Sequence, residues 1–257
     1  MILEAFRLQR SRFIETVSGF GPAEWQADSR CTDWSVHEVL RHVRDAAAIH
    51  VERLGGRHAV FTTQGAFHPA TTPATWLAAS SGESPADTLR DLISLVEEED
   101  HLLTEKVERN PSETMPGPLR RTLHWSVFSL HFFWDAWIHE RDIMLPLGTA
   151  PASTPTEHRL ATMYGLLVAA APASWSGDHV RTTVLLDGSP DGNYEVFPTS
   201  AGVMRAAVAP LGSVAELRGP MGEVVDSLAG RGPELGEVFD ASPPSVSKLA
   251  LLRKVAT

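Results

Sequence analysis

The sequence has one cysteine, Cys31, and no long apolar run. A single cysteine among 257 residues excludes a disulfide within the chain and a zinc site built mainly from cysteines. No run of about 18 apolar residues exists, so we expect no segment to span a membrane. Residues 1–17 are amphipathic and interrupted by charges, unlike a secretory signal. We therefore expect a cytoplasmic protein.

Basic residues are also scarce. Lys and Arg number 22 against 32 Asp and Glu, which gives a net charge of −10. A nucleic-acid-binding surface needs a basic stripe, and the basic residues here are scattered. We expect neither nucleic acid nor a membrane as partner. The composition does not indicate an oligomeric state.

The spacing of apolar residues predicts four helices in residues 1–148. They are expected over 1–18, from Ser35 to Leu54, from Ser84 to beyond Leu103, and from near Pro118 to near Pro146. Few strand signals interrupt them, so this part is predicted to be a helical bundle.

Three local features refine the predicted bundle. Ser35 and Glu38 have the spacing of a capping box, which would begin the second helix. Residues 57–83, with His68 and Trp76, read as a long connection that either closes over a site or is a surface excursion. The acidic run 97–100 is predicted to form a solvated face of the third helix.

The composition changes after Gly148, where a stretch rich in Thr, Pro, Ala and Ser resembles a linker. Residues 149–257 are predicted to form a smaller α+β domain, so the whole chain is placed in the α+β class. The elements expected here are a helix over 156–172, strands over Val180–Leu186, Tyr194–Pro198, Val203–Val208 and Ser213–Leu217, and a helix over Gly219–Gly230.

The fourth predicted helix carries an unusual set of polar residues. His131, Asp135 and His139 are spaced by four, so they share an arc of about 80° on a helix. His124 and Asp142 are expected in the same arc. The apolar residues of this helix, expected on a neighbouring face, are Leu123, Val127, Leu130, Trp134, Trp137 and Ile138.

Asp135 and His139 form a good chelating pair, because both side chains reach one ion from successive turns. A catalytic zinc ion commonly takes three protein ligands and keeps one open position. His42, beside Val39 and Val43 on the second helix, is the best candidate for the third. The same spacing also suits a hydrogen-bonded pair without metal, with His42 as a packed or surface histidine.

Three segments resemble a known family. They are Phe20–Trp25 (FGPAEW), Cys31–His42 (CTDWSVHEVLRH) and Trp134–Asp142 (WDAWIHERD). The chain resembles the mycothiol-dependent maleylpyruvate isomerase family, within the broader DinB-like group of metal-binding bundles. The resemblance implies a DinB-like four-helix bundle followed by a smaller domain.

The resemblance also implies a ligand set. The matching positions, His42, Asp135 and His139, would bind a divalent metal, usually zinc. The isomerase has Glu at the acid position, whereas Asp135 is one methylene shorter. Two histidines and one carboxylate with open positions also suit iron, nickel or cobalt.

The resemblance leaves the roles of three neighbouring residues open. Asp142 either orients the imidazole of His139 or is a plain carboxylate at a helix end. His131 is either a fourth ligand or substrate contact, or a structural histidine. We interpret Cys31 as a buried structural residue rather than a nucleophile.

The C-terminal half resembles the family more weakly, mainly over Val214–Arg231. The family motif there ends in Gly-Arg, and its arginine is thought to help bind or turn over substrate. The match nominates Arg231 as a catalytic residue, because a guanidinium offers two parallel donors to a carboxylate. The alternative is a helix end, with Gly230 as the cap and Arg231 exposed.

Three functions fit these expectations. The first is a metal-dependent thiol transferase or isomerase that activates a small-molecule thiol, such as mycothiol, toward an electrophilic small molecule. The second is a metal enzyme acting through water or Lewis-acid catalysis without a thiol. The third is a non-catalytic small-molecule binding protein on the same fold.

Overall fold

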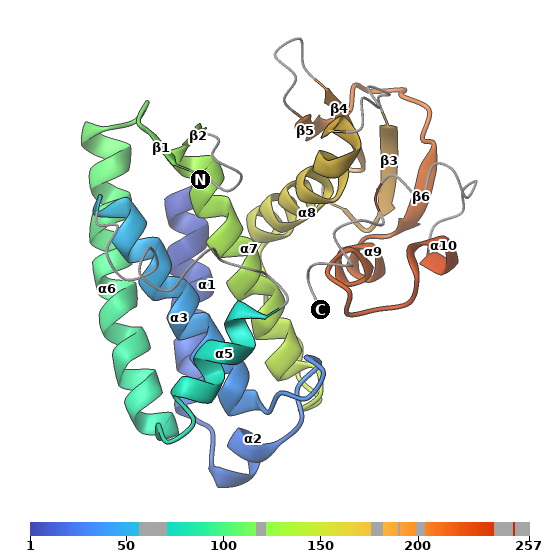
Figure 1. Ribbon diagram of the computed structural model, residues 1–257. Coiled ribbons are helices and arrows are strands. Elements are labelled where there is room, and N and C mark those ends of the chain that lie inside the picture. The colour runs from blue at the N-terminus through green and yellow to red at the C-terminus, as the bar shows by residue number, and fades with distance from the viewer. Residues whose placement is uncertain are drawn as a thin grey trace. The chain divides into compact units, whose positions relative to one another are not determined.

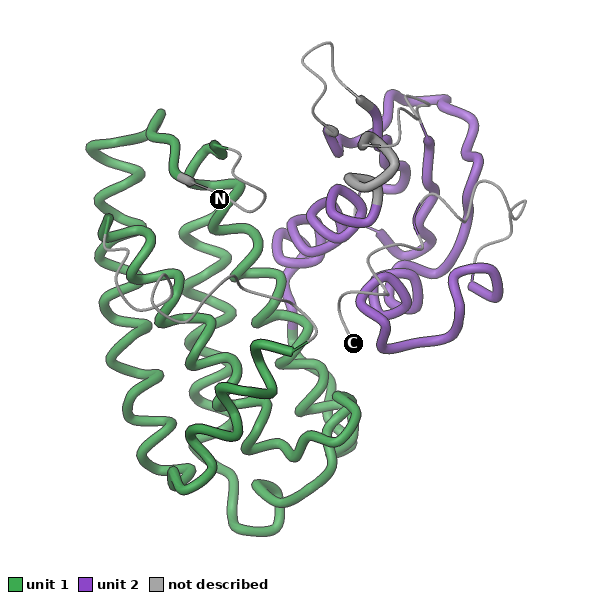
Figure 2. Tube along the Cα trace, viewed as in Figure 1, with its two compact units in different colours: residues 1–152 green, residues 153–257 purple. Residues whose placement is uncertain are grey.

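The computed structural model describes residues 1–56, 71–116, 122–175, 182–189, 191–198, 204–238 and 249. The chain divides into two compact units, Met1–Ala152 and Ser153–Thr257 (Figure 2). Among the described helices, none is long and apolar enough to cross a membrane.

The first unit is a bundle whose long helices lie side by side (Figure 1). In its described part these are α1 (Ile2–Ser18), α3 (Val36–Leu54), α6 (Pro85–Arg109) and α7 (Trp125–Met144). Two short helices, α2 (Pro22–Gln26) and α5 (Thr72–Ala79), and an antiparallel pair of strands, β1 (Thr114–Pro116) and β2 (Thr122–His124), complete the described elements. This architecture confirms the expected bundle.

Side-chain caps mark where α3 and α6 begin. The Glu38 N–H donates to Ser35 Oγ at 3.3 Å, and the Ser35 N–H donates to the Glu38 carboxylate at 2.8 Å. This is the predicted capping box, and it begins the helix that carries His42. Ser84 caps α6 by accepting the Asp87 N–H at 3.2 Å, without the reciprocal backbone bond.

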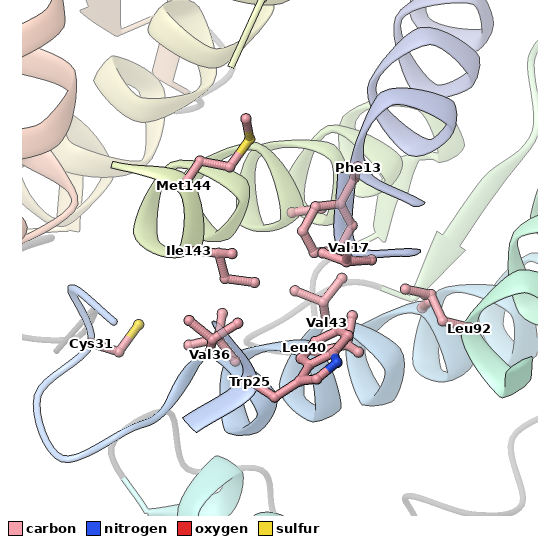
Figure 3. Close-up of a cluster of buried hydrophobic side chains, with 13 residues drawn as sticks. Phe13, Val17, Trp25, Cys31, Val36, Leu40, Val43, Leu92, Ile143 and Met144 are labelled. Carbon is pink, nitrogen blue, oxygen red and sulfur yellow. The ribbon is translucent and has the colours of Figure 1, made fainter. Parts of the chain in front are cut away.

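The core of the bundle is built from apolar side chains of all four long helices. Figure 3 shows their packing, with Cys31 at the margin on the loop that leads into α3. The labelled members are Phe13, Val17, Trp25, Cys31, Val36, Leu40, Val43, Leu92, Ile143 and Met144. Because α3 and α7 pack on each other through this core, their polar residues are held in register.

Helix α7 begins later than expected. Its first residue is Trp125, and Leu123, expected on the helix, lies in β2 opposite Met115. Pro118, the expected start, lies outside the described residues. His124 is also not on the helix but caps it, because its Nδ1 accepts the Ser126 N–H at 3.2 Å.

The segment 57–83 is not wholly irregular, since α5 occupies Thr72–Ala79 within it. Trp76 lies on this helix, whereas His68 lies outside the described residues. A proline near its start and a run of small residues made this short helix hard to predict from periodicity.

The prediction of a solvated face over residues 97–100 is wrong for Glu99. This side chain is 1% exposed and accepts from the Arg10 Nε–H at 2.9 Å. His50 Nδ1 lies 2.6 Å from the same carboxylate, and His50 Nε2 lies 2.9 Å from Ser129 Oγ. Burial is tolerated because the charge is paired and hydrogen-bonded.

In the second unit, the described strands form one sheet in the order β5–β4–β3–β6. Strands β3 and β6 are parallel and the other neighbours are antiparallel. The elements are α8 (Pro155–Trp175), β3 (Thr182–Asp187), β4 (Asn193–Pro198), β5 (Met204–Val208), β6 (Leu217–Pro220), α9 (Met221–Leu228) and α10 (Leu235–Val238). Helices and a mixed sheet confirm the α+β class.

The strand expected over Ser213–Leu217 is displaced toward the C-terminus. The Ser213 N–H donates to the Pro210 carbonyl in a turn, and β6 begins only at Leu217, where it pairs with Val184. The expected strand starts Val180 and Val203 lie outside the described residues.

Candidate metal centre

Two helices bring the three expected ligands together. His42 lies on α3, and Asp135 and His139 lie one turn apart on α7. One ligand atom from each of these residues lies within 4.8 Å of the other two. Asp135 Oδ1 is 3.6 Å from His42 Nε2 and 3.6 Å from His139 Nε2. The two imidazole rings meet edge to face, with their centroids 4.8 Å apart.

These separations are too long for hydrogen bonds. Two ligands bound at about 2.0–2.1 Å to one tetrahedral ion lie roughly 3.3–3.4 Å apart, which is close to the observed spacing. Asp135 Oδ2 is buried and has no hydrogen-bond partner in the part of the chain that the structure describes. The spacing and the unpaired carboxylate oxygen fit a shared cation, and the ligand role of the three residues stays a prediction.

The charge state of Asp135 also suits a cation. Burial by itself would raise the pKa of this carboxyl group, but His139 and then His42 favour the charged form. The pKa of Asp135 consequently lies well below its usual value. A metal ligand must be deprotonated, so Asp135 is ready to bind at neutral pH.

His139 is held from its other ring nitrogen. Its Nδ1 lies 3.0 Å from Asp142 Oδ2, and the Asp142 side chain is fully buried. An Nδ1–H donated to a carboxylate leaves the Nε2 lone pair free on the side of Asp135. The contact favours the orienting role of Asp142 over a plain carboxylate at the helix end, and that role stays a prediction.

His131 lies one turn before Asp135 and is exposed. It does not belong to the groups of described residues that could hold a metal. Desolvation by the surrounding protein lowers the pKa of the His131 imidazole, and the negative charge of Asp135 opposes this effect. Because His131 lies beside the ligand set, its role as a substrate contact stays a prediction. The geometry of the described residues does not support a role as a fourth ligand.

Cys31 is buried, as expected, and it contacts a residue of the centre. Its Sγ lies 3.2 Å from Asp142 Oδ2 and 3.6 Å from His139 Nδ1. Trp34, three residues on, lies against His42 with ring centroids 5.3 Å apart. Sequence spacing could not reveal the contact with Asp142, because the two residues are 111 positions apart.

Arg231 follows α9 in the second unit and is partly buried. Its N–H donates to the Asp226 carbonyl at 2.8 Å, and its guanidinium donates to the Ala229 carbonyl at 3.3 Å. Gly230 has a φ of +74°, which is common where a helix ends. The backbone matches a helix end at Gly230, but Arg231 is partly buried rather than exposed. The catalytic role of Arg231 stays a prediction.

Comparison with known proteins gives one family and two structures. The family model described as the mycothiol maleylpyruvate isomerase N-terminal domain matches residues 6–144. A crystal structure of the mycothiol-dependent maleylpyruvate isomerase aligns with a TM-score of 0.59 and 18% identity, covering 91% of this chain and 89% of that one. A histidine-to-alanine mutant of that isomerase aligns with a TM-score of 0.59 and 17% identity, covering 93% and 90%. No curated protein matches significantly.

Proposed function

The chain belongs to the mycothiol maleylpyruvate isomerase N-terminal domain family, and from this we propose that it is a metal-dependent enzyme that activates a small-molecule thiol. The activated thiol would be transferred to an electrophilic small molecule or would isomerise it. The observation that carries the proposal is the convergence of His42, Asp135 and His139 on one point between α3 and α7.

Each of these residues has a part in the proposal. His42 and His139 would present Nε2 to the ion, and Asp135 would supply a negative charge that its surroundings already favour. When bound, zinc or a similar divalent ion supplies the Lewis acidity that keeps a thiol in its thiolate form. Iron, nickel or cobalt would suit the same donors.

The sulfur would come from outside the protein. The sole cysteine, Cys31, is 6% exposed and its thiol contacts a buried carboxylate. It is therefore poorly placed to attack a substrate, and mycothiol is the cosubstrate that the family suggests. Arg231 would bind a carboxylate of the substrate or stabilise a developing enolate. Maleylpyruvate, named for the similar structures, is one electrophile to test.

The proposal is tested by metal and thiol binding. Elemental analysis should find about one divalent ion per chain after gentle purification or reconstitution, and none in His42→Ala or His139→Ala. Cobalt-loaded protein should gain a thiolate-to-cobalt absorption band when mycothiol is added. S-methylated mycothiol, which cannot form a thiolate, is the matched control and should give no band.

The same experiment separates the alternatives. Cobalt binding without a thiolate band would indicate a metal enzyme that uses water or Lewis-acid catalysis alone. Failure to bind any divalent ion, with unchanged stability in His42→Ala and His139→Ala, would indicate a non-catalytic binding protein and overturn the proposal.

A further inference from the structure

A second polar cluster shares the candidate ligand His139 and surrounds its Nδ1 atom. It consists of Cys31, His139 and Asp142, all buried, and one polar atom of each lies within 4.8 Å of the other two. One carboxylate oxygen, Asp142 Oδ2, is 3.0 Å from His139 Nδ1 and 3.2 Å from Cys31 Sγ. The thiol and the imidazole therefore meet the same oxygen.

The loop that carries Cys31 is itself fixed to the bundle. The Cys31 N–H donates to Ser29 Oγ at 3.0 Å, and the Trp34 N–H donates to the Cys31 carbonyl at 3.2 Å. The Arg30 N–H donates to the Asp142 backbone carbonyl at 3.0 Å. The thiol is thus presented to α7 from a backbone that is bonded both within its own loop and to the end of that helix.

We propose that Cys31 is a positioning residue of the metal centre. Its thiol donates a hydrogen bond to Asp142 Oδ2, and this bond limits rotation of the carboxylate that receives the Nδ1–H of His139. The imidazole is then kept in one tautomer, with Nε2 directed toward Asp135. This inference rests on the proposed function, because it assigns Cys31 a task at that metal centre.

The negative charge of the Asp142 carboxylate favours the protonated thiol form of Cys31. Cys31 and Asp142 are both buried, and Arg30 Nε lies 3.6 Å from Asp142 Oδ1. A thiolate 3.2 Å from Asp142 Oδ2 would add a second negative charge to this poorly solvated site. A thiol donor avoids this repulsion and gives the carboxylate a second hydrogen bond. The same three side chains could alternatively bind a second ion, which the experiment below detects as a metal content of two.

The test compares Cys31→Ala, Cys31→Ser and the control Val17→Ala. Alanine removes the donor, and serine keeps one on a shorter bond. Val17→Ala creates a defect in the same apolar core without removing a polar group from the centre.

The first readout is the tautomer of His139. In metal-free protein with 15N-labelled histidine, the His139 ring is assigned from the signals missing in His139→Ala. We expect a single Nδ1–H tautomer in the native chain and the control, and a tautomer mixture in Cys31→Ala.

Cobalt titration supplies the second readout. We expect Cys31→Ala to weaken cobalt binding about tenfold, at the lower end of the range for residues that orient a ligand, and to change the visible spectrum of the ion. Cys31→Ser should recover most of the affinity, and the control should match the native chain. If Cys31→Ala fails to fold, Cys31→Val takes its place, because valine fills the space of the thiol without a donor; a tautomer mixture and weakened cobalt binding are expected there, and native behaviour would overturn the inference.

Two results would overturn the inference. An unchanged His139 tautomer together with native cobalt affinity in Cys31→Ala would show that the thiol only fills space. Two ions per chain, falling to one in Cys31→Ala, would make Cys31 a ligand instead. Failure of the native chain to bind cobalt would refute the proposed function separately, and the tautomer measurement on metal-free protein would still decide whether Cys31 orients His139.

Discussion

Arg10 on α1 and Glu99 on α6 form an ion pair that is shielded from water, with Nε 2.9 Å from Oε2. The carboxylate also meets His50 Nδ1 at 2.6 Å, and the His50 ring stacks on Phe132 at 4.6 Å between centroids. The Glu99 carboxylate therefore joins three helices of the bundle. Loss of the ion pair should lower the free energy of unfolding of the whole first unit.

Replacing Arg10 by methionine should destabilise the protein strongly. The substitution leaves Glu99 buried without its cation, and breaking such a pair typically costs about 3–5 kcal/mol. Arg7 pairs with Asp100 between the same two helices, but both side chains are largely exposed, so Arg7→Met should leave the unfolding midpoint nearly unchanged. Urea unfolding measures both, and equal losses would contradict the prediction.

Stability should fall as the solution becomes acidic, in two stages. Burial lowers the pKa of His50 below its usual 6.5, so the unfolded chain binds more protons and stability declines below about pH 6.5. Burial opposes the charged form of Glu99, but Arg10 and His50 hold its pKa at about 2 instead of 4.5. Its contribution is present above pH 4.5 and is lost toward pH 2. Thermal unfolding of Glu99→Gln should show a flatter decline below pH 4.5, and an unchanged decline would refute this account.

Removal of the cap of α3 should have a local and moderate effect. Ser35→Ala eliminates the oxygen that accepts the Glu38 N–H and should cost about 1 kcal/mol of unfolding free energy. Ser35→Thr retains a hydroxyl and should lose less. His42 lies two turns further along α3, so cobalt affinity measured well below the unfolding midpoint should stay native. A large fall in affinity would show that the cap positions the ligand as well.

Changes at Asp135 should separate charge from length. Asp135→Asn keeps the size of the side chain but removes the charge that the two imidazoles stabilise, so cobalt should bind much more weakly. Asp135→Glu keeps the charge on a side chain one methylene longer and should retain one cobalt ion with an altered visible spectrum. Calorimetry and absorption spectroscopy measure these effects. Equal affinity of Asp135→Asn and the native chain would exclude Asp135 as a ligand.

Helical periodicity was sufficient to place Asp135 and His139 on one face, because that relationship is local to α7. His42 was linked to them by the family resemblance, and its ligand role stays a prediction although the structure brings it beside Asp135. The helix start was misplaced because Leu123 is as suitable for a strand edge as for a helix. No local pattern distinguishes a strand from a helix at this position; the pairing with Met115 does.

Long-range partners explain why Glu99 is buried although its sequence context predicts a solvated face. Glu99 lies in a run of four acidic residues, a pattern that usually means a solvated helix face. Its burial depends on Arg10, which is 89 positions away, and on His50, which is 49 positions away. Neither partner is visible in a window of one or two helical turns, so such a residue is assigned correctly only when the packing of the helices is known.

The candidate ligands lie on helices that also form the core of the first unit, with Val43 beside His42 and Ile143 one turn beyond His139. An ion bound there would tie α3 to α7, so part of its binding energy would become folding energy. Metal starvation would then shorten the lifetime of the protein in the cell, since the loosened bundle would be open to proteases. The abundance of the protein, as well as its activity, would follow the supply of the metal.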